Sequence, residues 1–133
     1  DSLGHDAGDR LLVIAADLLR SVVRTTDIVA RIGGDEFAVL MPRCSSRAAE
    51  GVIRKLEEQQ GLRNGNPESM PVFLSLGAAG TDLGLSADVL LHEADQAMLR
   101  RKALSREHSR MRMLEWIERR RTRSLRKTPG QSL

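Results

Sequence analysis

Two adjacent carboxylates, Asp35 and Glu36, directly follow two adjacent glycines, Gly33 and Gly34. Glycine adopts positive φ without a steric clash, and because it has no side chain it lets a ligand come close to the backbone. Carboxylate oxygens are ligands that Mg²⁺ prefers, and a bound Mg²⁺ can in turn hold the phosphates of a nucleotide. These four residues therefore indicate a site for a magnesium ion and a polyphosphate.

The flanking residues indicate how this site would be presented. The runs Ile28–Ile32 and Phe37–Met41 are apolar and rich in residues that favour strands. They predict a β-hairpin with Gly33-Gly34 at its turn, which would place Asp35 and Glu36 at the exposed tip. A purely structural turn is the alternative, because two glycines followed by an acid are also common in hairpins without a ligand.

Two further motifs lie upstream of these carboxylates. One is Leu3-Gly4-His5-Asp6-Ala7-Gly8-Asp9, and the other is Arg24-Thr-Thr-Asp27, which is separated from Gly33 by five residues. Together the three motifs resemble the GGDEF family, whose members are diguanylate cyclases. The family's central signature is present letter for letter, the first segment resembles its GHxxGD, and the second resembles its RxxD inhibitory site. The resemblance runs from Asp1 to about Arg106, which is most of the chain.

The resemblance implies an enzyme that condenses two GTP molecules into cyclic di-GMP and two pyrophosphates as a homodimer. Each 3′-hydroxyl attacks the α-phosphate of the other GTP. Mg²⁺, with Mn²⁺ as the alternative, lowers the pKa of the hydroxyl and spreads the charge of the phosphates. Asp35 would be a metal ligand and base, and Glu36 a second metal-binding carboxylate. Gly33 and Gly34 would leave room for the nucleotide.

Three other residues match substrate-binding positions of the family. Asp9 resembles the acid that reads guanine through two hydrogen bonds, and its structural alternative is the N-cap of a helix over residues 10–23. Lys102 and Arg106 resemble a Lys and an Arg that contact phosphates, and their spacing places both on one helix face. A solvated basic helix end is the alternative for this pair. The segment departs from the family pattern at Leu99, Arg101, Ser105 and Glu107.

Arg24 and Asp27 resemble the site at which the product, cyclic di-GMP, inhibits the enzyme. An arginine can stack on guanine or donate to phosphate, and an aspartate can pair with a guanine edge. The alternative is an exposed ion pair at the end of a helix, which is common and contributes little. We favour the product site because the spacing to Gly33 is intact.

The elements that would position these residues form an α/β (α+β) domain. The apolar periodicity predicts helices over Asp9–Val23, from Ser45 or Ser46 to about Gln60 with Gly61 as the stop, and from Ser86 or Ala87 onward. A strand is predicted over Val72–Ala79. The resemblance implies a ferredoxin-like palm related to nucleotidyl cyclases, with a central, mostly antiparallel sheet and flanking helices.

The chain begins inside a motif, and its first residue is not Met. The resemblance implies a strand and a helix before this point, with a metal-binding Asp on that strand. We therefore expect residues 1–106 to form a GGDEF domain without its N-terminal strand and helix, with weak or no cyclase activity. The resemblance also implies a sensory or regulatory domain fused upstream.

Charge is unevenly distributed along the chain. Residues 1–99 hold 9 Lys and Arg against 15 Asp and Glu, whereas residues 100–133 hold 12 against 3. We expect residues 107–133 to form a basic, helical tail outside the domain, partly amphipathic through Met111, Leu114, Trp116, Ile117 and Leu125. The cluster Arg119–Arg121 suggests nucleic acid or an acidic membrane as a third partner class. Nucleic acid is not expected, because Trp116 is the only aromatic residue there.

Composition and the remaining motifs bound the location and leave one functional alternative. No apolar run approaches the ~20 residues that span a bilayer, and Cys44 is the single cysteine, so a cytoplasmic location is expected. Tethering to the inner membrane through missing N-terminal regions is a further option.

The alternative function is a non-catalytic module that binds cyclic di-GMP through Arg24 and Asp27. In that case the altered segment Ser105-Arg106-Glu107 indicates that catalytic turnover has been lost.

Overall fold

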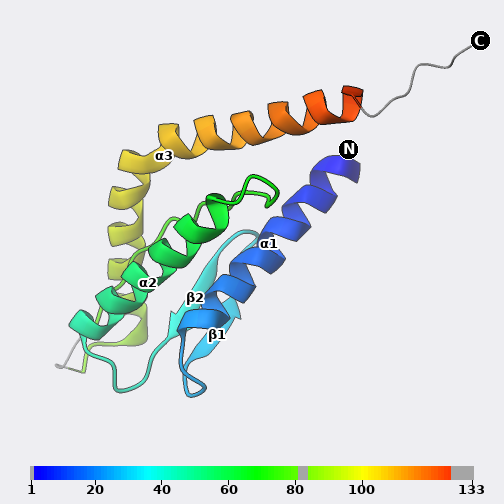
Figure 1. Ribbon diagram of the computed structural model, residues 1–133. Coiled ribbons are helices and arrows are strands. Elements are labelled where there is room, and N and C mark those ends of the chain that lie inside the picture. Colours follow the sequence, from blue (N-terminus) through cyan, green and yellow to red (C-terminus); the bar gives the residue numbers. More distant parts are fainter. Residues whose placement is uncertain (1, 81–83, 127–133) are drawn as a thin grey trace, which may run out of the picture.

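The computed structural model of the chain describes residues 2–80 and 84–126. Its elements in chain order are α1 (Ser2–Val22), β1 (Ile28–Arg31), β2 (Phe37–Leu40), α2 (Ser46–Asn64) and α3 (Ala87–Arg126) (Figure 1). This is an α+β arrangement, as predicted. Asp1 and residues 127–133 of the predicted tail lie outside the described residues. Of the described helices, none combines the length and the apolar character needed to cross a bilayer.

Helix α1 is longer than predicted, because it begins at Ser2 rather than near Asp9. Asp9 therefore lies inside the helix, and its predicted alternative role as an N-cap is wrong. Gly4 and Gly8 do not end the helix, since a helical glycine costs only about 1 kcal/mol relative to alanine. The buried face carries Ala15 and Leu19, and α1 packs against α2 and β1.

The predicted β-hairpin is confirmed, but its turn differs from the prediction. Strands β1 and β2 pair antiparallel from Ile28 opposite Leu40 to Arg31 opposite Phe37. The connection is a loop over residues 32–36, closed by the Ile32 N–H, which donates to the Glu36 carbonyl at 2.9 Å. Among the described residues positive φ occurs at Arg43 and Gly84, so neither glycine of the tip uses the conformation that a tight two-residue turn requires.

Helix α2 begins as predicted and ends later. The Ser45 side chain caps it by accepting a hydrogen bond from the Ala48 N–H at 3.1 Å. The helix passes through Gly61 and ends at Asn64, where the N–H of Gly65 donates to the Gly61 carbonyl at 2.9 Å. Its buried side chains are Ala49, Ile53 and Leu56, three of the core positions of the domain.

The strand predicted over Val72–Ala79 is wrong. The segment 70–80 contains neither helix nor strand, and within the described residues the sheet consists of β1 and β2 alone. Side chains of α2 bind its backbone instead. The Asn64 amide donates to the Val72 carbonyl at 2.7 Å and accepts from the Val72 N–H at 2.9 Å, and Gln60 Oε1 accepts from the Leu74 N–H at 2.7 Å.

Gly77 allows the segment 70–80 to lie directly against α3. A Cβ at Gly77 would overlap the Ala94 carbonyl and the backbone of Met98. At the far end, a Cβ at Gly80 would lie 2.7 Å from Ser46 Oγ. The small-residue run at the end of the predicted strand therefore serves helix packing rather than sheet formation.

Helix α3 is continuous across the predicted boundary between domain and tail, and Figure 1 shows that it bends near its middle. Two hydroxyls donate back into the helix in this region. Ser105 Oγ donates to the Arg101 carbonyl at 3.4 Å, and Ser109 Oγ donates to the Ser105 carbonyl at 3.1 Å. Such bonds compete with the helical carbonyl partners and favour local bending of a helix.

Candidate functional site

The tip of the β1–β2 hairpin is held by an arginine that the sequence motifs do not include. Arg31 Nη2 donates to the Gly34 carbonyl at 2.6 Å, and Arg31 Nε lies 3.2 Å from the Gly33 carbonyl and 3.1 Å from that of Gly34. The side chains of Asp35 and Glu36 are exposed, and neither belongs to the ion pairs found among the described residues. The tip is therefore shaped by Arg31 and the backbone, while its two carboxylates face solvent.

The two glycines differ in what surrounds them. A Cβ added to Gly34 would meet nothing within 4 Å, whereas one added to Gly33 would lie 3.0 Å from Glu36 Oε2. A ligand can therefore reach the backbone directly at Gly34. At Gly33 the Glu36 side chain covers the backbone and would have to move.

The donor set at the tip suits one particular kind of metal binding. Within the described residues no cluster of three His, Cys, Asp or Glu side chains could hold a metal ion, and the tip offers the two carboxylates of Asp35 and Glu36. Mg²⁺ is commonly bound by one or two carboxylates together with substrate phosphates and water, whereas Ca²⁺ and structural zinc sites need more protein ligands. The residues present therefore fit a magnesium ion that arrives with a nucleotide.

Asp9 and the hairpin tip lie toward the same end of the pair formed by α1 and β1. Helix α1 and strand β1 are in contact and run in opposite directions (Figure 1). Asp9 precedes Val22 by about 20 Å at 1.5 Å per helical residue, and Gly33 follows Ile28 by about 17 Å at 3.3 Å per strand residue. The exposed Asp9 carboxylate and the hairpin tip therefore lie near the same end of the α1–β1 pair.

Arg24 and Asp27 form a compact unit in the turn between α1 and β1. Arg24 Nη2 lies 2.9 Å from Asp27 Oδ1, while the Arg24 N–H and Nε donate to Asp27 Oδ2 at 2.8 and 3.4 Å. Arg24 Nη2 also donates to the Pro42 carbonyl at 2.8 Å. The Asp27 side chain is only 1% exposed, against 53% for that of Arg24. The hydrogen bonds from Arg24 lower the pKa of Asp27, and the same contacts raise the pKa of Arg24.

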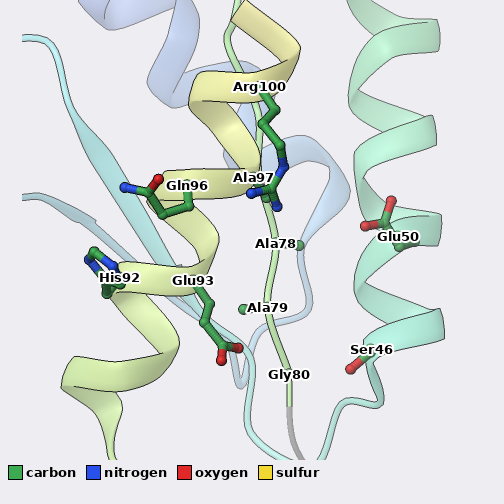
Figure 2. Close-up of a pocket in the computed structure, with 10 residues that line it drawn as sticks. All are labelled: Ser46, Glu50, Ala78, Ala79, Gly80, His92, Glu93, Gln96, Ala97 and Arg100. Atoms are coloured by element: carbon green, nitrogen blue, oxygen red, sulfur yellow. The ribbon is translucent and has the colours of Figure 1, made fainter.

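A separate cavity of about 370 Å³ lies between α2, α3 and the segment 78–80. Figure 2 shows Ser46 and Glu50 directed into it from α2 and Arg100 from α3. Next to it, Arg101 of α3 pairs with Glu50 at 2.9 Å. The cavity contains none of the predicted site residues, so it is distinct from the hairpin tip.

Comparison with known proteins decides the family. Residues 1–108 match the family described as "Diguanylate cyclase, GGDEF domain". The chain belongs to the GGDEF family. The α+β arrangement and the membership in this palm-fold family confirm the predicted fold class, although the sheet of the described residues is smaller than expected.

Several curated proteins share sequence with this GGDEF domain. Diguanylate cyclase TpbB of Pseudomonas aeruginosa is 36% identical over 116 residues, which cover 84% of this chain and 26% of TpbB. Cyclic di-GMP phosphodiesterase NbdA of the same species is 35% identical over 113 residues, covering 82% of this chain and 14% of NbdA. Diguanylate cyclase A of Treponema denticola is 34% identical over 106 residues, which cover 77% of this chain and 28% of that protein. The chain thus spans about a quarter or less of the length of two of these relatives. No solved structure gives a significant match.

The GGDEF domain does not bring all predicted site residues together. Lys102 and Arg106 are exposed on α3, which packs on the segment 70–80 and pairs with α2 through Arg101. The hairpin tip belongs instead to the unit of α1, β1 and β2. The predicted phosphate-contacting pair therefore lies on a different part of the surface from Asp35 and Glu36.

Proposed function

We propose that this GGDEF domain is a diguanylate cyclase domain that converts two GTP molecules into cyclic di-GMP and two pyrophosphates. The observation that carries the proposal is the hairpin tip of a GGDEF-family chain, where the open backbone of Gly34 lies beside two exposed carboxylates. This combination gives a triphosphate a place to approach the backbone and a charge partner for its metal ion.

The chain's own residues would act as follows. Asp35 and Glu36 hold Mg²⁺, with Mn²⁺ as the alternative, and the ion supplies charge neutralisation and a more acidic 3′-hydroxyl when bound. Asp35 accepts the proton of the 3′-hydroxyl. Asp9 would accept two hydrogen bonds from guanine, and Lys102 and Arg106 would contact phosphates.

The balance of the reaction requires two protomers. Each O3′ forms a bond to the α-phosphorus of the other GTP, the bond from that phosphorus to the β-phosphate bridge breaks, and pyrophosphate leaves. Because one hairpin tip holds one GTP, two tips must face each other, and the active species is a homodimer. Positioning of two bound substrates supplies a large part of the rate enhancement in such a reaction.

We assign Arg24 and Asp27 to product inhibition with unequal roles. The Asp27 carboxylate is nearly inaccessible and accepts hydrogen bonds on both oxygens from Arg24. The guanidinium of Arg24 is half exposed and would contact the guanine or phosphate of cyclic di-GMP. Asp27 then acts as a positioning residue that fixes the direction of Arg24, rather than as the group that pairs with guanine.

Two observations favour the alternative, a non-catalytic module that binds cyclic di-GMP. Lys102 and Arg106 lie on a helix that continues as a helix through Ser105 and Glu107, away from the hairpin tip. The similarity to NbdA, which is named a phosphodiesterase, also shows that a related segment occurs in a protein named for a different activity.

Binding of a fluorescent GTP analogue to the 133-residue chain tests the proposal. We expect binding that requires Mg²⁺ and that is reduced at least tenfold in Glu36→Gln, because this substitution removes one of the two metal-binding charges. Glu57→Gln, an exposed change of the same type on α2, should bind like the parent. Binding that is independent of Mg²⁺, or equally weakened in both variants, would overturn the assignment of the tip.

A further inference from the structure

The half of α3 beyond its bend presents an exposed face with a regular pattern. At about 100° per residue, eight side chains fall within about 120° of the helix circumference. All eight are exposed, and we define them as the outer face: Glu107, Arg110, Met111, Leu114, Ile117, Glu118, Arg121 and Leu125. The four apolar members are between 43% and 76% exposed. Such a run of exposed apolar side chains on a helix marks an interaction surface.

The opposite side of the same helix half attaches it to the rest of the chain. Arg112 Nη2 donates to the Asn64 carbonyl at 3.1 Å, and Arg123 pairs with Glu68 at 2.7 Å. Trp116 is partly buried on this side, with the Arg120 guanidinium 4.9 Å from its ring centroid. The outer face therefore points away from the domain, and Figure 1 shows this half of α3 at the edge of the molecule.

The charges on the outer face are arranged symmetrically about Leu114. Glu107 and Arg121 stand seven residues on either side of Leu114, and Arg110 and Glu118 stand four residues on either side. In both pairs one member is acidic and the other is basic. Met111 and Ile117 stand three residues on either side, and both are apolar. The face is therefore complementary to itself when a second copy is turned end for end.

We infer that the outer face of α3 is a self-association surface that pairs with a second copy of this chain in an antiparallel, two-fold symmetric manner. With the two Leu114 side chains on the symmetry axis, Glu107 lies opposite the partner's Arg121, and Arg110 lies opposite the partner's Glu118. Met111 and the partner's Ile117 lie at the same level along the helices, at opposite edges of the face. Each pairing occurs twice, as a two-fold interface requires, so four opposite-charge pairs flank the two Leu114 side chains along the helices.

The same pattern disfavours a membrane as the occupant. Glu107 and Glu118 lie within the outer face itself, where an acidic side chain would be repelled by anionic lipid. The arginines in excess lie elsewhere on the helix: Arg112, Arg119, Arg120, Arg123 and Arg126. Only Arg110 and Arg121 belong to the face, where two acids balance them. A second copy offers an apolar centre and opposite charges together.

This contact is separate from the catalytic arrangement proposed above. The outer face lies almost wholly beyond residues 1–108, which match the family, and it does not include the hairpin tip. The contact spans about 21 Å of helix from Glu107 to Arg121, which is small for a specific interface. We therefore expect a dimer that dissociates in the micromolar range.

Sedimentation velocity of the full 133-residue chain, with charge-reversal variants, tests this inference. The parent chain should dimerise with rising concentration. Arg110→Glu and Glu118→Arg should each be monomeric, because each places like charges opposite one another. Arg126→Glu, an equal charge change outside the outer face, should dimerise like the parent.

Mixing provides the sharpest outcome. Arg110→Glu has two acids at these two positions and Glu118→Arg has two bases, so an equimolar mixture of the two monomeric variants should form a heterodimer. The double variant Arg110→Glu/Glu118→Arg should regain the homodimer. A parent chain that stays monomeric, or a dimer that neither single variant affects, would overturn the inference. So would a parent that binds anionic vesicles through Leu114 and Ile117 while staying monomeric in solution.

Discussion

Arg24 and Asp27 are joined by hydrogen bonds to both carboxylate oxygens, with Arg24 Nη2 2.9 Å from Asp27 Oδ1 and the Arg24 N–H 2.8 Å from Asp27 Oδ2. Through its additional bond to the Pro42 carbonyl, Arg24 links the turn before β1 to the turn after β2. The motif therefore fixes both open ends of the hairpin whose tip carries Asp35 and Glu36. The same residues that we assign to product binding also define the base of the substrate-binding element.

Replacing Arg24 should destabilise the domain as well as abolish product binding. Arg24→Ala removes the guanidinium donors of the nearly inaccessible Asp27 carboxylate and leaves it the backbone N–H of residue 24, and a buried charge without its counter-ion is unfavourable. We expect a lower Tm in thermal unfolding and no detectable binding of cyclic di-GMP by calorimetry. Arg10→Ala on α1, where Arg10 is exposed, should change neither quantity. A parent-like Tm for Arg24→Ala would show that the link between the turns is unimportant for stability.

The lowered pKa of Asp27 predicts the pH dependence of stability. Arg24 favours the ionised Asp27 carboxylate in the folded state. As the pH falls, this carboxylate therefore becomes protonated at a higher pH in the unfolded chain than in the folded protein. The stabilisation is present above the ordinary carboxyl pKa of about 4 and is lost as the pH falls through the lowered value. Urea unfolding from pH 6 downward should show this loss in the parent and a shallower loss in Asp27→Asn. Equal slopes would contradict the assignment.

Two glycine-to-alanine substitutions should separate packing from ligand access. Gly77→Ala places a Cβ on the backbone of α3 and should destabilise the domain by about 1–3 kcal/mol. Gly34→Ala meets nothing within 4 Å, so its effect on stability should stay within about 0.5 kcal/mol, while binding of the GTP analogue should weaken. If Gly34→Ala binds GTP as well as the parent, the nucleotide does not approach the tip at this glycine.

The paired hydrogen bonds from Asn64 to Val72 predict a stability effect far from the tip. Asn64→Ala removes the donor and the acceptor that the segment 70–80 uses in place of a neighbouring strand. The loss should be about 1–3 kcal/mol in urea unfolding, since two backbone groups lose their partners. Asn64→Asp keeps the acceptor for the Val72 N–H but turns a carboxylate oxygen toward the Val72 carbonyl, so it should lose at least as much stability as Asn64→Ala. An Asn64→Ala variant as stable as the parent would mean that these two bonds contribute nothing.

The features that were predictable from sequence depend on neighbouring residues. The hairpin follows from two β-favouring runs around Gly33-Gly34, and the start of α2 follows from the Ser45 cap; both are confirmed. The family follows from three motifs in order, and the comparisons confirm it. Each of these features is encoded by residues that are close together in the sequence.

The features that were missed depend on partners elsewhere in the chain. The segment 72–79 has the composition of a strand, but Asn64 and Gln60 of α2 bind its backbone, and Gly77 places it against α3. The role of Arg31 at the hairpin tip depends on a loop geometry that the tight-turn prediction did not include. The start of α1 at Ser2 was missed because the apolar periodicity predicted the helix only from Asp9, and Gly4 and Gly8 are weak helix formers.

Synthesis of cyclic di-GMP at the hairpin tip is tested most directly by measuring product formation. The 133-residue chain is incubated with GTP and Mg²⁺, and cyclic di-GMP is quantified by mass spectrometry beside Glu36→Gln and Glu57→Gln. We expect slow but measurable synthesis by the parent and by Glu57→Gln, and none by Glu36→Gln. Synthesis by Glu36→Gln at the rate of the parent would contradict the proposed cyclase chemistry at the hairpin tip, because one of the two metal-binding carboxylates would then be dispensable.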